Sequence, residues 1–261
     1  MTDDDLLELF REAARRTADT LRAIEDRRPT TEVHGQYALD VATDGVVVPL
    51  LLDAGLGVLS EESGLHHPER EIVVVVDPVD GSTNASRHIP WFNSSLCAVD
   101  ADGPRVASVV NLVSGETFEA VRGGGARCDG APITSSGVTE LADALVIFNG
   151  VPTRHWGWDQ GRILGAAALD LCLVAAGRVD AYVDLAGHHG PWDYMAALLV
   201  CREVGVELVD AAGRDLVVLD HSARRSPQAA ATPQLLERIL EQRGHEPSAN
   251  AGPTAMSPTQ A

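Results

Sequence analysis

One segment constrains the fold of this chain more than any other. Residues 72–76, Ile-Val-Val-Val-Val, form an unbroken run of β-branched side chains, and the sequence Asp77-Pro-Val-Asp-Gly-Ser-Thr-Asn84 follows directly. Such a run is typical of a strand that is buried on both faces. We therefore predict a central strand that stops at Asp77-Pro78 and presents the carboxylates of Asp77 and Asp80 at its end.

The residue types in this segment suit metal-assisted phosphate chemistry. Two carboxylates at the lip of a rigid strand can share hard divalent cations, because Mg²⁺ prefers oxygen ligands. Gly81 permits a sharp turn, after which the main-chain N–H groups of Gly81, Ser82 and Thr83 can face an anion. For a pattern of this kind on its own, a solvated aspartate-rich turn is the alternative interpretation.

Two further segments carry acidic residues next to predicted elements. Ser60-Glu61-Glu62-Ser63 follows a short apolar stretch, residues 56–59, and Pro191-Trp192-Asp193 stands at the start of an apolar helical pattern. Alone, Glu61 would be a surface charge and Asp193 an ordinary acid at a helix N-terminus. Their occurrence together with Asp77 and Asp80 argues against both of these interpretations.

Together these three segments resemble the motifs of the inositol monophosphatase family, which comprises magnesium-dependent, lithium-sensitive phosphomonoesterases. The family carries DPxDG(S/T)TN, an upstream GEE(S/T) and a downstream WD, which here stand at residues 77–84, 60–63 and 192–193. Supporting matches are Ala42-Thr43-Asp44, residues 123–130 and residues 165–184. The resemblance spans roughly residues 5–220 and implies a layered αβαβα sugar-phosphatase fold of mixed α+β and α/β character.

The resemblance also implies roles for individual residues. Two or three Mg²⁺ ions would be held by four carboxylates and one main-chain carbonyl, those of Glu61, Asp77, Asp80, Asp193 and Val79. Ser82 would sit against the attacking water with its hydroxyl oriented by Asp44, while Glu61 and its metal lower the pKa of that water. The substrate would contact Asp80, Gly81, Ser82, Thr83, Ala167, Asp184 and Asp193.

Departures from the family pattern concentrate on the substrate side. The segment 142–164 is shorter than usual, the segment between Asp184 and Asp193 is longer, and Asp184 replaces the usual glutamate. We therefore predict an altered leaving-group pocket. An inositol monophosphate-like polyol phosphate is the default substrate, and histidinol phosphate, 3'-phosphoadenosine 5'-phosphate and fructose 1,6-bisphosphate are the other classes that the family implies. A metal- and phosphate-binding protein with little turnover is the non-enzymatic alternative.

Two groups of ring side chains allow two interpretations each. Trp156 and Trp158 could form a lid over a ligand, or pack within the shortened segment. The histidine pairs at 66–67 and 188–189 could be solvated loop residues, and His188 or His189 could line the mouth of the substrate site. Adjacent residues on an extended chain point apart, so neither pair is expected to bind one metal ion jointly.

Hydrophobic periodicity predicts the remaining elements. Helices are expected over 4–24, 46–54, 165–176, 192–204 and 233–243, with Pro49 tolerated only in a first turn. Strands are expected over 56–59, 72–76, 94–99, 105–111, 117–121, 144–148, 179–184, 206–210 and 215–218, the third to fifth forming an antiparallel meander. We expect an N-terminal α+β half (1–134) that carries the metal motifs, a C-terminal α/β half (135–243) that completes the site, and a disordered tail (244–261).

The composition narrows the class of protein. The chain has 38 acidic residues against 20 basic ones, all of them arginine, and a formal net charge of -18. This balance disfavours binding to nucleic acid or to an anionic membrane. The four cysteines form no CxxC pair, no apolar run is long enough to span a bilayer, and the opening Met-Thr-Asp-Asp-Asp is unlike a secretory leader. We expect a cytoplasmic protein, and the resemblance implies a homodimer that acts on a small phosphorylated substrate.

Overall fold

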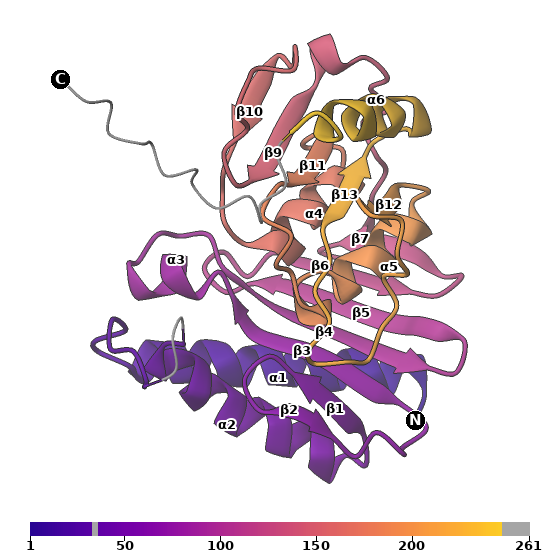
Figure 1. Cartoon of the computed structure of the whole chain (residues 1–261). Coiled ribbons are helices and arrows are strands. Elements are labelled where there is room, and N and C mark those ends of the chain that lie inside the picture. Colours follow the sequence, from indigo (N-terminus) through magenta and orange to yellow (C-terminus); the bar gives the residue numbers. More distant parts are fainter. Residues whose placement is uncertain (33–35, 247–261) are drawn as a thin grey trace, which may run out of the picture.

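The computed structural model describes residues 1–32 and 36–246 of the chain. In that part, two β-sheets alternate with three layers of helices in the order αβαβα (Figure 1). The layered fold expected from the sequence is confirmed. No helix in the described ranges is long and apolar enough to cross a membrane.

The first layer consists of α1 (Asp3–Ala23) and α2 (Ala38–Asp53). Thr2 caps α1: its hydroxyl accepts a hydrogen bond from the N–H of Asp5, whose carboxylate accepts one from the N–H of Thr2. Leu6 and Phe10 then bury an apolar stripe against the first sheet. The helix expected over residues 4–24 is confirmed.

The second helix corrects one prediction. α2 begins at Ala38 rather than near residue 46, and Pro49 lies close to its C-terminal end rather than in its first turn. Proline costs the helix one hydrogen bond, but Val47, Val48 and Leu51 are buried against the sheet on either side of it. Tertiary packing therefore decides the extent of α2, as it does for most helices.

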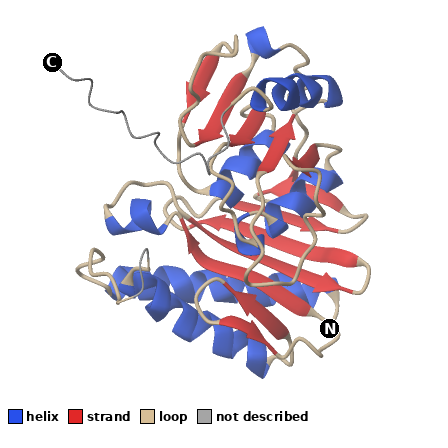
Figure 2. Ribbon diagram, viewed as in Figure 1, coloured by secondary structure: helices blue, strands red, loops and turns tan. Residues whose placement is uncertain are grey.

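The first sheet has eight strands in the order β2-β1-β3-β4-β5-β6-β7-β8 (Figure 2). They are β1 (Gly57–Ser60), β2 (Gly64–His66), β3 (Val73–Asp80), β4 (Asn93–Asp100), β5 (Gly103–Asn111), β6 (Thr117–Val121), β7 (Gly125–Cys128) and β8 (Ala131–Pro132). β1 runs parallel to β3, and every other neighbouring pair in this sheet is antiparallel. The expected meander is therefore present, extended by β7 and β8.

The central strand is longer than expected. β3 does not stop at Asp77-Pro78 but runs on to Asp80, with a shift in its register against β4. Asp77 faces Ser95 and Asp80 faces Asn93, so β3 holds one extra residue over this interval. A bulge of this kind accommodates proline within a sheet, because the extra residue leaves the hydrogen-bonded ladder.

The second sheet has five strands in the order β10-β9-β11-β13-β12. They are β9 (Leu145–Asn149), β10 (Gln160–Arg162), β11 (Ala181–Asp184), β12 (Glu207–Asp210) and β13 (Pro227–Ala230). The strand expected over 215–218 is wrong, because the Asp215 side chain accepts a hydrogen bond from the N–H of Val217 and forms a turn there. β13 was not predicted, since its sequence Pro-Gln-Ala-Ala has little β-propensity.

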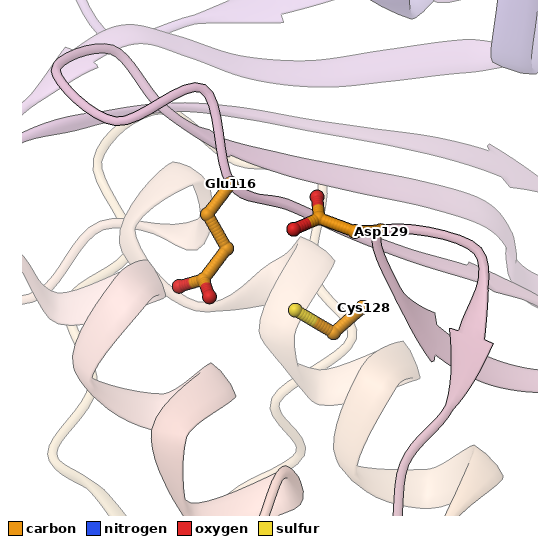
Figure 3. Close-up of side chains that lie close together, drawn as sticks. All are labelled: Glu116, Cys128 and Asp129. Carbon is orange, nitrogen blue, oxygen red and sulfur yellow. The ribbon is translucent and has the colours of Figure 1, made fainter.

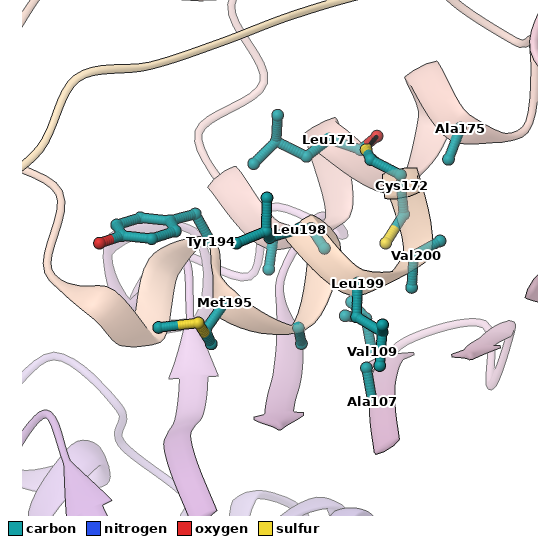
Figure 4. Packing of buried hydrophobic residues seen from close by; sticks show 14 of the residues in the cluster. Ala107, Val109, Leu171, Cys172, Ala175, Tyr194, Met195, Leu198, Leu199 and Val200 are labelled. Carbon is teal, nitrogen blue, oxygen red and sulfur yellow. Dashed lines mark hydrogen bonds between the residues drawn. The ribbon is translucent and has the colours of Figure 1, made fainter. Parts of the chain in front are cut away.

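Helices α4 (Ala167–Ala175) and α5 (Met195–Glu203) fill the space between the sheets, and α6 (Pro233–Arg243) covers the outer face of the second sheet (Figure 1). All nine residues of α4 are buried, as expected for a helix that is apolar all round. Figure 4 shows Leu199 and Val200 of α5 packing beside Val109 of β5 and Cys172 of α4.

Three short helices complete the chain: α3 (Ser82–Ser86), and the 3₁₀ turns η1 (Leu141–Asp143) and η2 (Pro191–Asp193). Most of the expected disordered tail, residues 247–261, lies outside the described residues. Glu246, inside the range expected to be disordered, accepts hydrogen bonds from the N–H of Thr153 at 2.9 Å and from the indole of Trp156 at 2.7 Å.

Candidate metal centre

Four carboxylates from three distant segments converge beside the end of β3. Oxygen atoms of Asp77, Asp80 and Asp193 all lie within 4.8 Å of one another. Glu61, from the turn after β1, lies near enough for its carboxyl group and those of Asp77 and Asp193 to influence one another's pKa. The structure therefore brings together the four side chains from which a metal site was expected.

The bulge in β3 explains how Asp77 and Asp80 reach one site. In a regular strand, residues three apart point to opposite faces of the sheet. The extra residue between Asp77 and Asp80 cancels this alternation and turns both carboxylates the same way. The N–H of Val79 donates to Asp77 Oδ1 at 2.9 Å and fixes the bulged segment. With the bulge in place, a spacing of three residues brings the carboxylates of Asp77 and Asp80 to the same side of the strand.

The electrostatics of this cluster favour a bound cation. Burial, followed by the charges of the neighbouring carboxylates, raises the pKa of Glu61 and of Asp77 well above the usual range. Burial and the charge of Asp193 raise the pKa of Asp80 to about 6. No arginine in the described ranges forms an ion pair with any of the four. Of these four carboxylates, His189 neighbours that of Asp193 alone, so the cluster keeps an excess of negative charge that is costly to bury, and an all-oxygen ligand set suits Mg²⁺.

Asp80 is the most firmly held of the four. Its Oδ2 accepts hydrogen bonds of 2.8 Å from the side chain of Asn93 and from the N–H of Ala168, and its Oδ1 accepts one from the N–H of Ala167. The N–H groups of Ala167 and Ala168 lie at the N-terminus of α4, where the helix dipole favours a negative charge. Ala167 was expected beside the substrate, but its side chain is only 6% exposed. In the structure its amide holds Asp80.

The position of Ser82 corrects the expectation for Asp44. The Ser82 hydroxyl donates to the carbonyl of Val79 at 2.8 Å and lies beside the carboxyl of Asp40. Asp44, one helical turn further along α2, accepts a hydrogen bond from the buried hydroxyl of Ser60 instead. The structure does not bring Asp44 to Ser82, because the helix starts earlier than expected and places Asp40 there.

Asp40 has the environment of a functional carboxyl group. Its Oδ2 accepts a hydrogen bond from the N–H of Tyr37, whereas Oδ1 is buried without a hydrogen-bond partner in the described part of the chain. Burial raises the pKa of Asp40 to about 6, against the lowering effect of Ser82. Asp40 precedes Asp44 by four residues, so both occupy one face of α2. A helix predicted to begin at Ala38 would have placed Asp40 on the same face as Asp44.

The phosphate-binding residues expected after β3 lie at the start of α3. Gly81 has a φ of 92°, in the left-handed region that favours glycine, and turns the chain from β3 into the helix. Thr83 is exposed, and its hydroxyl lies 3.3 Å from the phenol oxygen of Tyr37.

Asp184 does not occupy the expected substrate surface. Its side chain is 0% exposed, and its oxygens accept hydrogen bonds from Asn149 Nδ2 and from the N–H groups of Ala186 and Gly187. All of these partners belong to the protein. The aspartate side chain, one methylene shorter than the family's usual glutamate, is buried at the end of β11. This burial does not fit a contact with substrate hydroxyls.

His189, one of the two histidines that the sequence allows at the mouth of the substrate site, links this group to the metal carboxylates. Its Nδ1 lies 3.1 Å from Asp193 Oδ2, and its Nε2 lies 3.0 Å from Asn149 Nδ2 and 2.8 Å from the Tyr182 hydroxyl. In the neutral imidazole, Nε2 accepts from Asn149 Nδ2, which also donates to Asp184; in the protonated imidazole both ring nitrogens donate, Nε2 to the Tyr182 hydroxyl. In both forms Nδ1 donates to Asp193. In the sequence, the one signal for this contact is that His189 stands four residues before Asp193.

The protonation of His189 reflects the same neighbours. Burial by itself lowers the pKa of this imidazole, but the hydrogen bond to Asp193 and the charges of Asp193, Asp184 and Asp80 raise it to about 9. His188, the other member of the pair, is exposed. The solvated interpretation therefore holds for His188 and is wrong for His189.

The tryptophans pack rather than form a lid. Trp156 is 7% exposed and meets Phe148 edge-on, with ring centroids 5.6 Å apart. The ring centroid of Trp158 lies 4.8 Å from that of Phe148 and 5.9 Å from that of Trp156. These rings join the core between the second sheet and α6.

Figure 3 shows a second group of possible ligands, Glu116, Cys128 and Asp129. An arginine, Arg178, closes this group. Arg178 Nη1 lies 2.7 Å from Glu116 Oε1, and its Nη2 lies 3.6 Å from Cys128 Sγ. Burial raises the pKa of Cys128 to about 11, so the sulfur stays a neutral thiol. Asp129 accepts a hydrogen bond from the N–H of Thr117. This group is satisfied by the protein itself.

Comparison with known proteins agrees with this geometry. The model of the inositol monophosphatase family matches residues 54–247. A protein of Thermococcus kodakarensis named fructose-1,6-bisphosphatase/inositol-1-monophosphatase is 31% identical over 225 residues, which cover 83% of this chain and 87% of that protein. Nus factor SuhB of Vibrio cholerae is 33% identical over 201 residues, which cover 70% of this chain and 73% of the relative.

A solved structure shows the same fold. A Pyrococcus horikoshii protein, described as similar to inositol-1 monophosphatase, superposes with a TM-score of 0.84 at 24% identity, over 92% of this chain and 99% of that one. The fold, the family match and the acidic cluster agree with one another. The chain therefore belongs to the inositol monophosphatase family of metal-dependent phosphoric monoester hydrolases.

Proposed function

We propose that this protein hydrolyses a small phosphate monoester with Mg²⁺, through in-line attack by an activated water. The observation that carries the proposal is the convergence of Glu61, Asp77, Asp80 and Asp193 without a cationic partner from arginine. These carboxylates and the carbonyl of Val79 would hold two or three Mg²⁺ ions. When bound, such ions stabilise charge on phosphoryl oxygens and lower the pKa of a coordinated water.

The chain's own groups suit the orientation of that water. The single hydroxyl hydrogen of Ser82 can point to the Val79 carbonyl, as it does here, or to the unpartnered Oδ1 of Asp40. Rotation toward Asp40 frees the carbonyl of Val79 to act as a ligand. It also leaves a lone pair of Ser82 to accept a hydrogen bond from the water. Asp40 thus takes the positioning role that was expected for Asp44.

The phosphate would lie against the start of α3. The main-chain N–H groups of Gly81 and Ser82, with Thr83 nearby, supply donors at the point where the left-handed Gly81 turns the chain. Asp80 and Asp193 border the same space. A homodimer, which the family resemblance supports, and a cytoplasmic location, which the widely spaced free cysteines support, belong to the same proposal.

An inositol monophosphate-like polyol phosphate is the substrate that we propose first. Fructose 1,6-bisphosphate is the second candidate, because relatives from Pyrococcus furiosus and Thermococcus kodakarensis carry that activity in their names. A bisphosphate needs a second cationic pocket. Arg224 and Arg225, whose loop borders the site, donate to main-chain carbonyls rather than to carboxylates.

The test is phosphate release from a panel of substrates, with Mg²⁺ and with EDTA. The panel holds inositol 1-phosphate, fructose 1,6-bisphosphate, histidinol phosphate and 3'-phosphoadenosine 5'-phosphate. Asp193→Asn should abolish release, whereas the control Asp102→Asn, at an exposed turn, should not. Binding of Mg²⁺ without release from any substrate would favour the non-enzymatic alternative.

A further inference from the structure

We propose that His221 is a positioning residue of the metal centre, which holds the main chain of Glu61 against the segment that carries Asp193. This inference rests on the proposed metal site. His221 lies in the loop between β12 and β13 and is exposed. Neither the family motifs nor the spacing of charges in the sequence singles it out.

The first observation is a long-range hydrogen bond. His221 Nε2 lies 2.8 Å from the main-chain oxygen of Glu61, which is 160 residues away in the chain. A carbonyl oxygen only accepts, so Nε2 carries the hydrogen and the tautomer of His221 is assigned by its partner. The N–H of Glu61 donates to the carbonyl of Val76, next to Asp77, at 3.2 Å. Glu61 is therefore held on both sides of its main chain.

The second observation is the packing of the same imidazole on Trp192, the residue directly before Asp193. The two ring centroids are 4.9 Å apart with an angle of 35° between the planes. The guanidinium of Arg224 lies 5.2 Å from the centroid of the Trp192 ring. The indole is only 4% exposed. The 221–224 loop thus helps to cover the base of the Asp193 segment.

These contacts form a continuous path between carboxylates on different parts of the fold. It runs from β3 through Glu61 and His221 to Trp192, and so to Asp193. Four carboxylates that repel one another spread apart unless the main chain restrains them. A ligand set that is held in place before the cation arrives binds it more tightly, since less ordering is required on binding.

The test compares Mg²⁺ affinity, measured by isothermal titration calorimetry on the full chain. His221→Phe keeps a ring against Trp192 and removes the donor, and should weaken Mg²⁺ binding by about tenfold, the lower end of the effect of lost outer partners. His221→Gln restores a donor and should recover most of the affinity. In the metal-free His221→Phe protein, amide hydrogen exchange at residues 61–64 should be faster than in the wild type.

The matched control is His66→Phe. His66 lies in β2, on the same hairpin as Glu61, and its imidazole Nε2 lies 2.9 Å from the hydroxyl oxygen of Ser63. Unchanged Mg²⁺ affinity in His221→Phe, or an equal loss in His66→Phe, would overturn the proposal. The result is separable from the proposed function, because affinity is measured without substrate: a protein inactive on every phosphate ester still reports the role of His221.

Discussion

The hydroxyl of Ser82 lies beside the carboxyl of Asp40, while Asp44, one turn along the same helix, bonds to Ser60. The two acids therefore have different tasks. Asp40→Asn should lower kcat by about a hundredfold, the scale on which a positioned acid–base group contributes, with little change in the melting temperature. Asp44→Asn should lower the melting temperature, because it weakens a buried hydrogen bond, and leave kcat nearly unchanged.

Steady-state kinetics and thermal denaturation of both variants check this assignment. Ser82→Ala serves as the reference, since it removes the group on which Asp40 acts. A large loss of kcat in Asp44→Asn with full activity in Asp40→Asn would return the role to Asp44.

Asp77 should show a conflict between stability and function. Its carboxyl group is buried, and its pKa is raised first by burial and then by Glu61, Asp80 and Asp193. Asp77→Asn removes one of the repelling charges, so the metal-free variant should melt at a higher temperature than the metal-free wild type. The same variant should lose Mg²⁺ binding in calorimetry. A lower melting temperature in EDTA would show that the cluster is not a source of strain.

The stability of the metal-free protein should fall as the pH rises. Burial raises the pKa of Asp40 and Asp80 to about 6, and raises that of Glu62 to about 7. The folded state therefore binds more protons than the unfolded state from near pH 4 to pH 7, and loses that stabilisation across this window. His189, whose pKa is raised to about 9, continues the trend in the same direction at higher pH.

Bound Mg²⁺ competes with protons for the carboxyl groups of the metal site whose pKa is raised, those of Glu61, Asp77 and Asp80. It should therefore raise the melting temperature strongly near pH 7.5 and only slightly near pH 5, values that bracket the titration window. Differential scanning calorimetry in EDTA and in excess Mg²⁺ at both values measures the effect. An equal shift at the two values would contradict the assignment of the raised carboxyl groups to the metal site.

Asp184 should behave as a structural residue. Three donors surround its carboxylate, which has no exposed surface. Asp184→Asn would place an amide among donors and should cost about 1–3 kcal/mol of unfolding free energy. The KM of the folded variant should stay close to that of the wild type. Chemical denaturation and kinetics at saturating Mg²⁺ check both parts, and a large rise in KM without loss of stability would support the substrate contact.

The sequence predicted those parts of the candidate site that depend on residues close together in the chain. The buried strand that leads to Asp77 and the acids at 61 and 193 could be predicted from residue type, spacing and the motifs that they form, whereas the bulge in β3 and the short helix α3 could not. Asp40 could not be separated from Asp44 while the start of α2 was misplaced. The contacts of His189 and the burial of Asp184 could not be predicted, because they depend on Asn149 and Tyr182, which only tertiary folding brings near.

The helices α4 and α5 have a consequence for how this protein unfolds. They are apolar on nearly every side, and each packs between the two sheets, so neither sheet covers its inner face without them. A fragment ending near residue 134 would expose the face of the first sheet that α4 and α5 cover. The complementary fragment would expose the sides of α4 and α5 that pack on that sheet. We therefore expect one cooperative transition for the whole chain, with neither half behaving as an autonomous folding unit.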